Sequence, residues 1–172
     1  MSRLSPAIPR RDALRWTAAL AGLLGLAALS GATFGTVIAI TVGTTSRLAN
    51  LDTALSGWDR HGPALLVVAG FAVVMLLGAL RGARPAMVAV LVCGLAALAI
   101  ALVVDAPHLG DTGQIGELYT DARAGPGAGF WLEVAGGALL VVCGAALLLA
   151  HRAAWRPAPV AAAGASHSRT AP

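Results

Sequence analysis

Four long apolar segments follow one another along the chain, and short polar stretches separate them. These segments cover residues 16–41, 63–80, 85–104 and 130–150. Each holds about 18–26 residues, enough to cross a hydrocarbon core of about 30 Å as a helix that rises about 1.5 Å per residue. The period-two alternation of membrane β-barrels is absent, and backbone in lipid must satisfy its own hydrogen bonds. We therefore expect four transmembrane helices, of which the first is long enough to tilt or project beyond the bilayer.

The links between these segments predict how the helices are arranged. The sequence RGARP leaves only a few residues between the second and third segments, so these two helices should be antiparallel neighbours. Pro63 and Pro85 stand where a helix begins, a position that tolerates a missing N–H. The expected fold class is all-α: an antiparallel bundle of four transmembrane helices within residues 1–156. Residues 157–172 lack a hydrophobic pattern, and we expect a disordered tail there.

The composition excludes a water-soluble globule. Hydrophobic residues make up 58% of the 172 residues and charged residues make up 12%, and the mean hydropathy is +0.79. A chain with so little polar surface needs lipid as its solvent over most of its length. We therefore expect the lipid bilayer to be its main partner.

The charged residues predict the orientation in the membrane. The formal net charge is +4, and all twelve basic residues are arginine. The two termini and the RGARP link carry nine arginines and one acidic residue, whereas the other two loops carry three arginines and seven acidic residues. Because basic residues stay on the cytoplasmic side, both termini should be cytoplasmic, in a bacterial inner membrane. This distribution explains the sequence pI of about 10.5 without nucleic acid as a partner.

The N-terminal sequence also fits a second interpretation. The paired Arg10 and Arg11 precede an apolar stretch rich in Ala and Gly and then small residues, as in a twin-arginine signal. Cleavage of such a signal would leave three spans. The apolar run continues past Gly31 through GTVIAITVG, however, where a signal would end, so a retained first helix is favoured.

Small residues predict where the helices approach one another, because helix association in lipid depends on close backbone contact. The first span offers Gly31 and Gly35, four residues apart, with Ala27 on the same face. The third span repeats small residues at a spacing of four, at Ala89, Cys93, Ala97 and Ala101. We expect these two faces to pack against neighbouring helices.

The second outer loop is the most polar part of the chain. Residues 105–133 hold five of the eight acidic residues. The sequence DTG at 111–113 matches the aspartic protease signature only superficially, because that signature needs a β-rich fold with two such aspartates. Asp111 or Thr112 as an N-cap instead predicts a short helical cap from Gly113 to Ala124. Its apolar side chains, expected to point toward the bundle, are Ile115, Leu118, Tyr119 and Ala122.

Two functions fit this loop. In the first, the loop is a docking face whose acidic residues steer a basic partner and whose aromatic side chains contact it. The residues of this candidate surface are Asp105, His108, Asp111, Glu117, Tyr119, Asp121, Trp131 and Glu133. In the second, Asp105, His108 and Asp111, spaced by three, line up with Glu117 or Asp121 to bind a divalent cation. No EF-hand or HExxH pattern supports the second function, and the exclusion of positive charge from this side already explains the acidic sign.

The spans themselves offer little chemistry. Glu133 is the one acidic residue that could enter lipid, and from the first outer turn of the last span it would reach interfacial water. Ion pumps and coupled transporters need charged groups near the middle of the membrane, so these classes are disfavoured. Cys93 and Cys143 lie in apolar runs without a CxxC or CxxH spacing, and we expect both to be buried thiols. We assign no catalytic, cofactor-binding or metal-ligating residue, and we expect neither an enzyme nor a cofactor.

The run LGDTGQIGELYTDARAGPGAGFWLEVAGG, followed by a final span, resembles a group of small four-span membrane proteins of actinobacteria. In that group a D-x-G-x-[IL]-G-E-x-[YF] loop precedes a G-x-G-[FW] start of the last helix, and the match covers the C-terminal half of this chain. The group carries no assigned activity, so the resemblance implies the four-span fold and no catalytic residue.

The leading functional hypothesis is an accessory or structural subunit of a larger membrane assembly. Such a subunit would act through helix packing and its acidic outer loop, with other membrane subunits or a second copy as partners. The alternative is a membrane protein of the sensor or transporter type that binds a small molecule or a cation under the outer loop.

Overall fold

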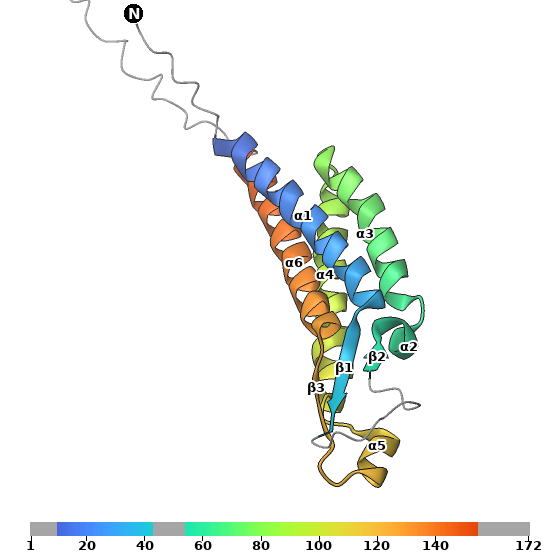
Figure 1. The fold of residues 1–172 in the computed structure, drawn as a ribbon. Coiled ribbons are helices and arrows are strands. Elements are labelled where there is room, and N and C mark those ends of the chain that lie inside the picture. The colour runs from blue at the N-terminus through green and yellow to red at the C-terminus, as the bar shows by residue number, and fades with distance from the viewer. Residues whose placement is uncertain (1–9, 43–53, 155–172) are drawn as a thin grey trace, which may run out of the picture.

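The computed structural model describes residues 10–42 and 54–154. Four long helices lie side by side in an antiparallel bundle (Figure 1): α1 (Arg10–Phe34), α3 (Ala64–Leu80), α4 (Arg84–Ala99) and α6 (Ala128–Ala154). The start of α1, the end of α6 and the link between α3 and α4 lie at one end of the bundle, which we call the arginine end. The opposite end, here called the sheet end, carries the shorter elements β1, β2, β3, α2 and α5.

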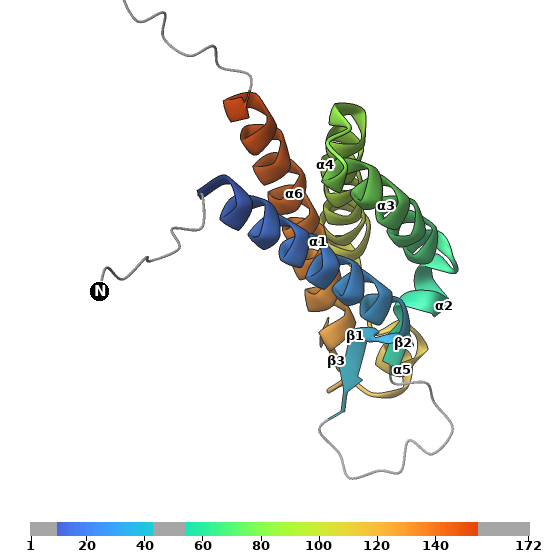
Figure 2. The ribbon, with the colours of Figure 1, turned by 90° about the horizontal axis from the view of Figure 1, so that it is seen from above.

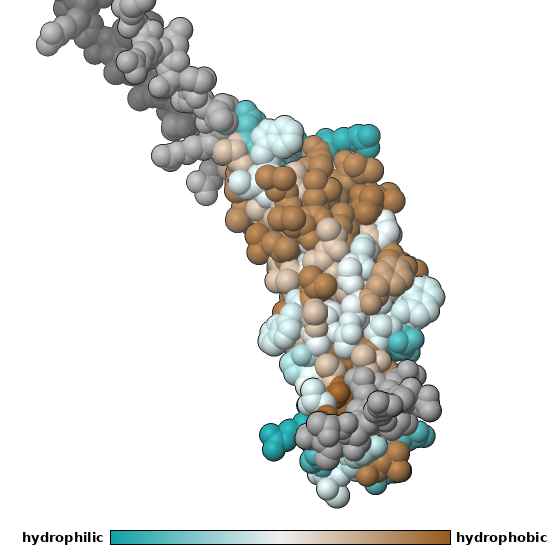
Figure 3. Space-filling model, viewed as in Figure 1, coloured by the Kyte–Doolittle hydropathy of each residue, from teal (hydrophilic) through white to brown (hydrophobic). Residues whose placement is uncertain are grey.

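Three of the helical segments are long and apolar enough to cross a membrane by length and composition: Asp12–Phe34, Arg84–Leu118 and Ala128–Ala153. The helix α3 is apolar but shorter, with 17 residues. Hydrophobic side chains gather over the helices on the visible face, and hydrophilic residues lie toward both ends (Figure 3). The prediction of several helices long and apolar enough to span a membrane is therefore confirmed for three helices, and the fourth crossing stays a prediction.

The prediction of one helix from Trp16 to Thr41 is wrong beyond Phe34. The residues Thr36–Thr41 form strand β1, which pairs antiparallel with β2 (Ala54–Ser56) and with β3 (Arg123–Pro126) in a three-stranded sheet of order β2-β1-β3. The sequence TVIAIT is rich in β-branched side chains, which favour a strand where partner strands are present. The fold is thus mostly helical with a small sheet, and the all-α prediction is corrected in this respect.

Glycine allows the sheet to join the bundle. A Cβ added to Gly127 would lie 2.2 Å from the carbonyl oxygen of Thr36, and one added to Gly129 would lie 2.7 Å from that of Gly35. The backbone of the β3–α6 junction therefore touches the backbone of the α1–β1 junction, which no larger residue at these two positions would permit. The N–H of Gly127 also donates a hydrogen bond to the carbonyl oxygen of Val37, at 2.8 Å.

The predicted Gly31-x-x-x-Gly35 face lies against α6, but its two glycines do not share one helix. Gly35 lies beyond the end of α1, where the chain turns into β1, and a Cβ added to it would lie 3.0 Å from the Cα of Gly129 in α6. A Cβ added to Gly31 would meet only Leu132 Cδ1 of α6, at an ordinary 3.6 Å, and Ala27 is exposed. The close approach to α6 is therefore made by Gly35, at the junction of helix and strand.

Helix α6 approaches two neighbours through adjacent glycines. A Cβ on Gly136 would lie 2.9 Å from the carbonyl oxygen of Gly25 in α1. A Cβ on Gly137 would lie 3.1 Å from the carbonyl oxygen of Gly94 in α4, and one on Gly94 would lie 2.6 Å from the backbone nitrogen of Val141. Small residues that let backbones touch are the usual means of helix association in lipid. The Gly136–Gly137 pair therefore fixes both α1 and α4 against α6.

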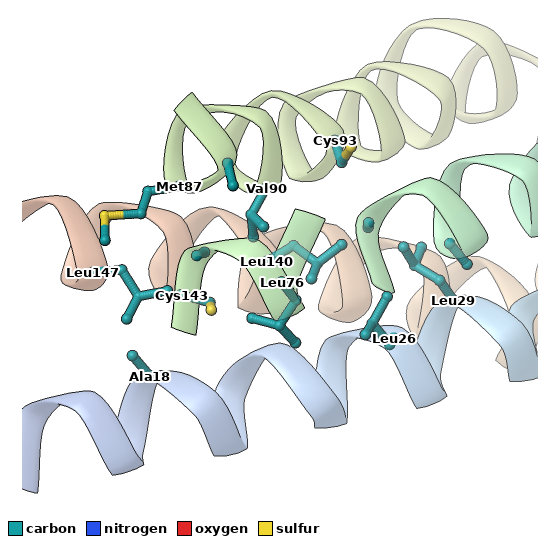
Figure 4. Packing of buried hydrophobic residues seen from close by; sticks show 14 of the residues in the cluster. Ala18, Leu26, Leu29, Leu76, Met87, Val90, Cys93, Leu140, Cys143 and Leu147 are labelled. Carbon is teal, nitrogen blue, oxygen red and sulfur yellow. The ribbon is translucent and has the colours of Figure 1, made fainter. Parts of the chain in front are cut away.

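The core between the helices is apolar (Figure 4). Its buried members include Leu29, Leu76, Val90, Leu140, Cys143 and Leu147. On the predicted small-residue face of the third span, Cys93, Ala97 and Ala101 are buried and Ala89 is half-buried. Both cysteines are free thiols in this interior. Among the long helices, α3 packs against α4 and α1 and lies at the edge of the bundle (Figure 2).

The predicted cap helix is shorter than expected. Helix α5 covers Gly113–Leu118 and ends where Tyr119 becomes extended. The chain then gains its hydrogen bonds from the sheet, because Arg123–Pro126 pairs with β1 as strand β3. Ile115 is buried as predicted, whereas Leu118 is exposed and Thr112 makes no side-chain capping hydrogen bond.

Other predictions made for loops and tails fall largely outside this part of the chain. Most of the first outer loop, residues 43–53, lies outside the described residues, and Leu55 belongs to strand β2. The predicted tail at 157–172 also lies outside them.

The glycine contacts make a direct prediction about stability. We expect Gly94→Ala to lower the free energy of unfolding by about 1–3 kcal/mol, because its methyl group would push α4 away from α6. The matched control is Gly70→Ala in α3, where an added Cβ meets nothing within 4 Å. We expect this control to be neutral or to stabilise by up to about 1 kcal/mol through its higher helix propensity. Thermal unfolding in mild detergent measures both, and equal effects of the two substitutions would contradict the packing described above.

Candidate functional site

A one-and-a-half-turn helix at the sheet end presents two basic side chains. Helix α2 (Gly57–His61) begins with a capping box, in which the Ser56 hydroxyl accepts a hydrogen bond from the Asp59 N–H at 3.2 Å. The Asp59 carboxylate in turn accepts hydrogen bonds from the Ser56 N–H at 3.1 Å and from its hydroxyl at 2.6 Å. This reciprocal arrangement satisfies donors at the start of the helix. Arg60 and His61 occupy its last turn.

Close backbone contacts fix α2 onto the bundle. The N–H of Gly57 donates to the carbonyl oxygen of Gly35 at 3.1 Å. A Cβ on Gly57 would lie 2.5 Å from the carbonyl oxygen of Ala32, so only glycine fits against the end of α1. Gly62, with φ of +56°, ends α2 in a conformation that favours glycine and turns the chain into α3. The direction in which Arg60 and His61 point is therefore set by the backbone.

Asp105 reaches the same place from α4. That helix continues as a π-helical segment, η1 (Ile100–Asp105), and then as a short 3₁₀ turn, η2 (Ala106–His108). Pro107 has no N–H and its ring clashes with the carbonyl group four residues earlier, so a regular α-helix cannot continue through it. The change of helix type at this point places Asp105 inside the protein, with 0% of its surface exposed.

Asp105 is held by both basic residues of α2. Arg60 Nε donates a hydrogen bond to Asp105 Oδ1, and His61 Nε2 donates to Oδ2 at 2.8 Å. Arg60 Nη2 also donates to the carbonyl oxygen of Val104 at 3.2 Å. Each carboxylate oxygen of Asp105 thus has its own partner from α2.

Glu133 faces this group from α6. Its side chain is fully buried, and neither carboxylate oxygen has a hydrogen-bond partner among the described residues. The possible ligand atoms of His61, Asp105 and Glu133 all lie within 4.8 Å of one another. We call Arg60, His61, Asp105 and Glu133 the buried polar cluster.

The charges in the cluster do not balance. Arg60 compensates Asp105, and among the described residues Glu133 has neither a hydrogen-bond donor nor a second cation to compensate its charge when it is ionised. An uncompensated buried charge costs several kcal/mol, and proteins avoid it by pairing or neutralising the group. The cluster is therefore suited to a positively charged ligand.

The structure separates the eight predicted surface residues into two groups. Asp105 and Glu133 are buried together, and the expectation that Glu133 reaches interfacial water is wrong, because α2 and the end of α4 cover it. The others are exposed except for Tyr119, which is half-buried: His108, Asp111, Glu117, Tyr119, Asp121 and Trp131. His108 Nδ1 donates to the carbonyl oxygen of Val104 at 2.8 Å. The sequence predicted that Asp105 shares a cation site with His108 and Asp111. Among the described residues, it is instead grouped with His61 and Glu133.

Sequence reasoning missed Arg60 and His61. The signal available to find them was SGWDRHG, in which Ser56 and Asp59 have the spacing of a capping box and Gly62 can end a short helix. That signal predicts a helix with a basic last turn, but not what faces it. The pairing with Asp105 and Glu133 joins residues far apart in the sequence.

The capping box predicts a pH dependence. Hydrogen bonds from the Ser56 side chain, and next from its backbone, hold the pKa of Asp59 below its ordinary value. A carboxylate with a lowered folded pKa adds stability above its unfolded pKa of about 3.9 and loses it as the pH falls through the folded value. We expect the difference in unfolding temperature between the wild type and Asp59→Asn to be largest near pH 7 and to shrink below about pH 4. Thermal unfolding across this range, with the exposed Asp111→Asn as control, measures it, and a constant difference would contradict the role of the cap.

Comparison with known proteins supplies no relative. No protein-family model matches the chain, and no curated protein and no solved structure matches it. The resemblance to actinobacterial four-span proteins stays a prediction, and the function has to be argued from the buried polar cluster.

Proposed function

We propose that this chain is a multi-pass membrane protein that binds a cation in the buried polar cluster. The observation that carries this proposal is Glu133, a fully buried carboxylate whose two oxygens have no hydrogen-bond partner among the described residues. A second carboxylate, Asp105, and an imidazole, His61, lie within reach of the same point. A cation there would supply the positive charge that the cluster lacks.

The proposed orientation puts this site on the outer side of the membrane. The start of α1, the end of α6 and the RGARP link lie at the arginine end, and the sequence around them is rich in arginine, so the positive-inside rule makes that end cytoplasmic and makes α3 a fourth crossing. The sheet end, with the buried polar cluster beneath α2 and the sheet, would then face outward. A cation would reach the cluster from the outer solution, where Arg60 is partly exposed.

The interior below the cluster favours a binding protein over a conducting one. The core between the four long helices consists of apolar side chains and two cysteines. Among the described residues, the one other buried polar side chain is Thr33, whose hydroxyl donates to the carbonyl oxygen of Leu29 at 3.2 Å. Ion pathways need polar groups through the membrane. We therefore propose a receptor or sensor that responds to a cation on one side of the membrane.

A bound cation would join three parts of the fold. His61 comes from α2, Asp105 from the end of α4 and Glu133 from the first turns of α6. Helices α4 and α6 already pack closely through Gly94 and Gly137, whereas α2 reaches Asp105 through Arg60 and His61, so the ion would hold α2 more firmly against the other two helices. That change in the outer surface is the signal that a partner protein could detect.

Glu133→Gln tests the proposal. Without a bound cation, and at a pH at which Glu133 is ionised, we expect the variant to unfold at a higher temperature than the wild type, because it removes an uncompensated buried charge worth about 1 kcal/mol or more. With cation at 100 times its dissociation constant, we expect about 2.7 kcal/mol of added stability for the wild type, or about 5–10 °C. The variant should not respond. Thermal unfolding with and without chelator, in the presence of single cations, measures both effects.

The matched control for this test is Glu117→Gln. Glu117 is an exposed acidic residue of α5 at the same end of the molecule, so its variant should keep the full response to the cation. A wild type whose unfolding temperature responds to none of the common monovalent and divalent cations would overturn the proposed function.

A second candidate, the accessory subunit, is favoured by one observation on α3. With 17 residues and a rise of about 1.5 Å per residue, this helix is several ångströms shorter than a hydrocarbon core of about 30 Å. Association with another helix is one of the ways in which a short span adapts. The exposed face that α3 would offer carries Val67, Gly70, Phe71, Val74 and Leu77.

Val74→Trp tests this second candidate. We expect the wild type, extracted in a mild detergent, to elute with a second copy or another membrane protein, and the bulky side chain to release it as a monomer. The control is Val92→Trp on α4, a comparably exposed position that should not affect association. Size-exclusion chromatography with light scattering distinguishes the two, and a monomeric wild type with nothing bound would contradict the subunit function.

A further inference from the structure

We infer that the cation is a divalent transition-metal ion of the Zn²⁺ class, bound by His61 Nε2 and by one carboxylate oxygen each from Asp105 and Glu133. This inference rests on the proposed function and makes it specific. It names a metal site at the sheet end of the bundle, beneath α2, that takes its three ligands from three separate elements.

The ligand types select the class of metal. Mg²⁺ and Ca²⁺ prefer oxygen ligands, whereas imidazole suits Zn²⁺ and its neighbours among the first-row metals. One imidazole with two carboxylates is therefore a set that a borderline metal fills better than an alkaline-earth ion. Three protein ligands also leave a fourth position open, as in zinc sites that keep a water molecule or take an external ligand.

The distances allow such a site once the side chains rotate, by about 1 Å for the most distant pair of ligand atoms. His61 Nε2 and Asp105 Oδ2 lie 2.8 Å apart, and the three possible ligand atoms lie within 4.8 Å of one another. Metal–ligand bonds of about 2.1 Å place neighbouring ligand atoms about 3.0–3.5 Å apart, depending on octahedral or tetrahedral geometry. The distance between His61 Nε2 and Asp105 Oδ2 would open by a few tenths of an ångström, the imidazole would carry its proton on Nδ1, and two bonds to the metal would replace the hydrogen bond.

Arg60 prepares Asp105 for this role. It donates to Oδ1 and to the carbonyl oxygen of Val104, which leaves Oδ2 directed toward His61. Partners that hold the second oxygen of a ligating carboxylate orient the ligand and raise the metal affinity. Arg60 is therefore a positioning residue, and it acts on the metal through Asp105.

The charge of the filled site is acceptable. Two carboxylates and Arg60 sum to one negative charge, so a divalent ion leaves one positive charge in the cluster. Arg60 keeps 19% of its side chain exposed, and water can solvate part of its charge. The open coordination position can also take an anionic ligand such as hydroxide, which would restore neutrality.

The test uses the full-length protein, purified in mild detergent with any affinity tag removed and stripped with a chelator. Zn²⁺, Co²⁺, Mg²⁺ and Ca²⁺ are added singly, and thermal unfolding and the visible absorption of Co²⁺ are recorded. We expect Zn²⁺ and Co²⁺ to raise the unfolding temperature, Co²⁺ to develop ligand-field absorption, and Mg²⁺ and Ca²⁺ to act at least 10-fold more weakly.

Three variants and one control identify the ligands. We expect His61→Ala and Glu133→Gln to lose the Co²⁺ absorption, and Arg60→Gln to weaken Zn²⁺ binding by about 10–100-fold while keeping the Co²⁺ spectrum of the bound form. His108→Ala removes the exposed histidine of the neighbouring turn and should bind as the wild type does. Because Glu133→Gln keeps the shape of the side chain, it remains informative if His61→Ala fails to fold.

The outcomes separate this inference from the proposed function. If Mg²⁺ or Ca²⁺ stabilises the protein as much as Zn²⁺ does, and His61→Ala keeps this stabilisation in full, the transition-metal assignment is overturned and a carboxylate cation site remains. Loss of Co²⁺ binding in His108→Ala in place of His61→Ala assigns the metal to the outer surface and also overturns the inference. A response to no cation at all overturns both.

Discussion

The close approach of α6 to its two neighbours is the constraint on which the rest of this fold depends. Gly136 and Gly137 let the backbones of α1 and α4 touch α6 at Gly25 and Gly94. Glu133 lies one turn before Gly137, on the same side of α6, so the contact that brings α4 near also turns this carboxylate toward α4. The pairing of helices through small residues thus decides which polar groups meet at the sheet end.

The close packing of α4 against α6 also determines where Asp105 lies. The buried residues Cys93, Ala97 and Ala101 recur every four residues, and Asp105 continues this series into the π-helical segment. The small side chains keep α4 close to α6 until the series ends in a carboxylate. Helix α2 then closes the site from the other side, because Gly57 holds it against the end of α1. The polar cluster is therefore a consequence of helix packing and needs no separate binding domain.

Much of the helical architecture could be predicted from the sequence, and most of the site could not. Long apolar runs predict three helices that are long and apolar enough to cross a membrane, because lipid leaves the backbone no alternative to helices. The strand Thr36–Thr41 was missed because β-branched apolar residues fit either a buried strand or the continuation of a helix, and only its pairing with Arg123–Pro126 decides between them. Asp105 and Glu133 were recognised as candidates from their position in the acidic segment. Their partners Arg60 and His61 were not, since their contacts with Asp105 join residues 44 and 45 positions apart and depend on packing that no local pattern encodes.

The buried polar cluster is more consistent with ligand binding than with a structural role. An ionised carboxylate in place of an apolar side chain of similar size at position 133 makes a helical bundle less stable, because its charge is removed from water without a compensating donor among the described residues. If the cluster existed only to tie α2 to α4, Arg60, His61 and Asp105 would suffice, since each oxygen of Asp105 already has a partner. Glu133 adds nothing to that link and introduces the unbalanced charge. Its presence is explained once a cation occupies the space between it, Asp105 and His61, because the same charge that destabilises the empty cluster then stabilises the filled one.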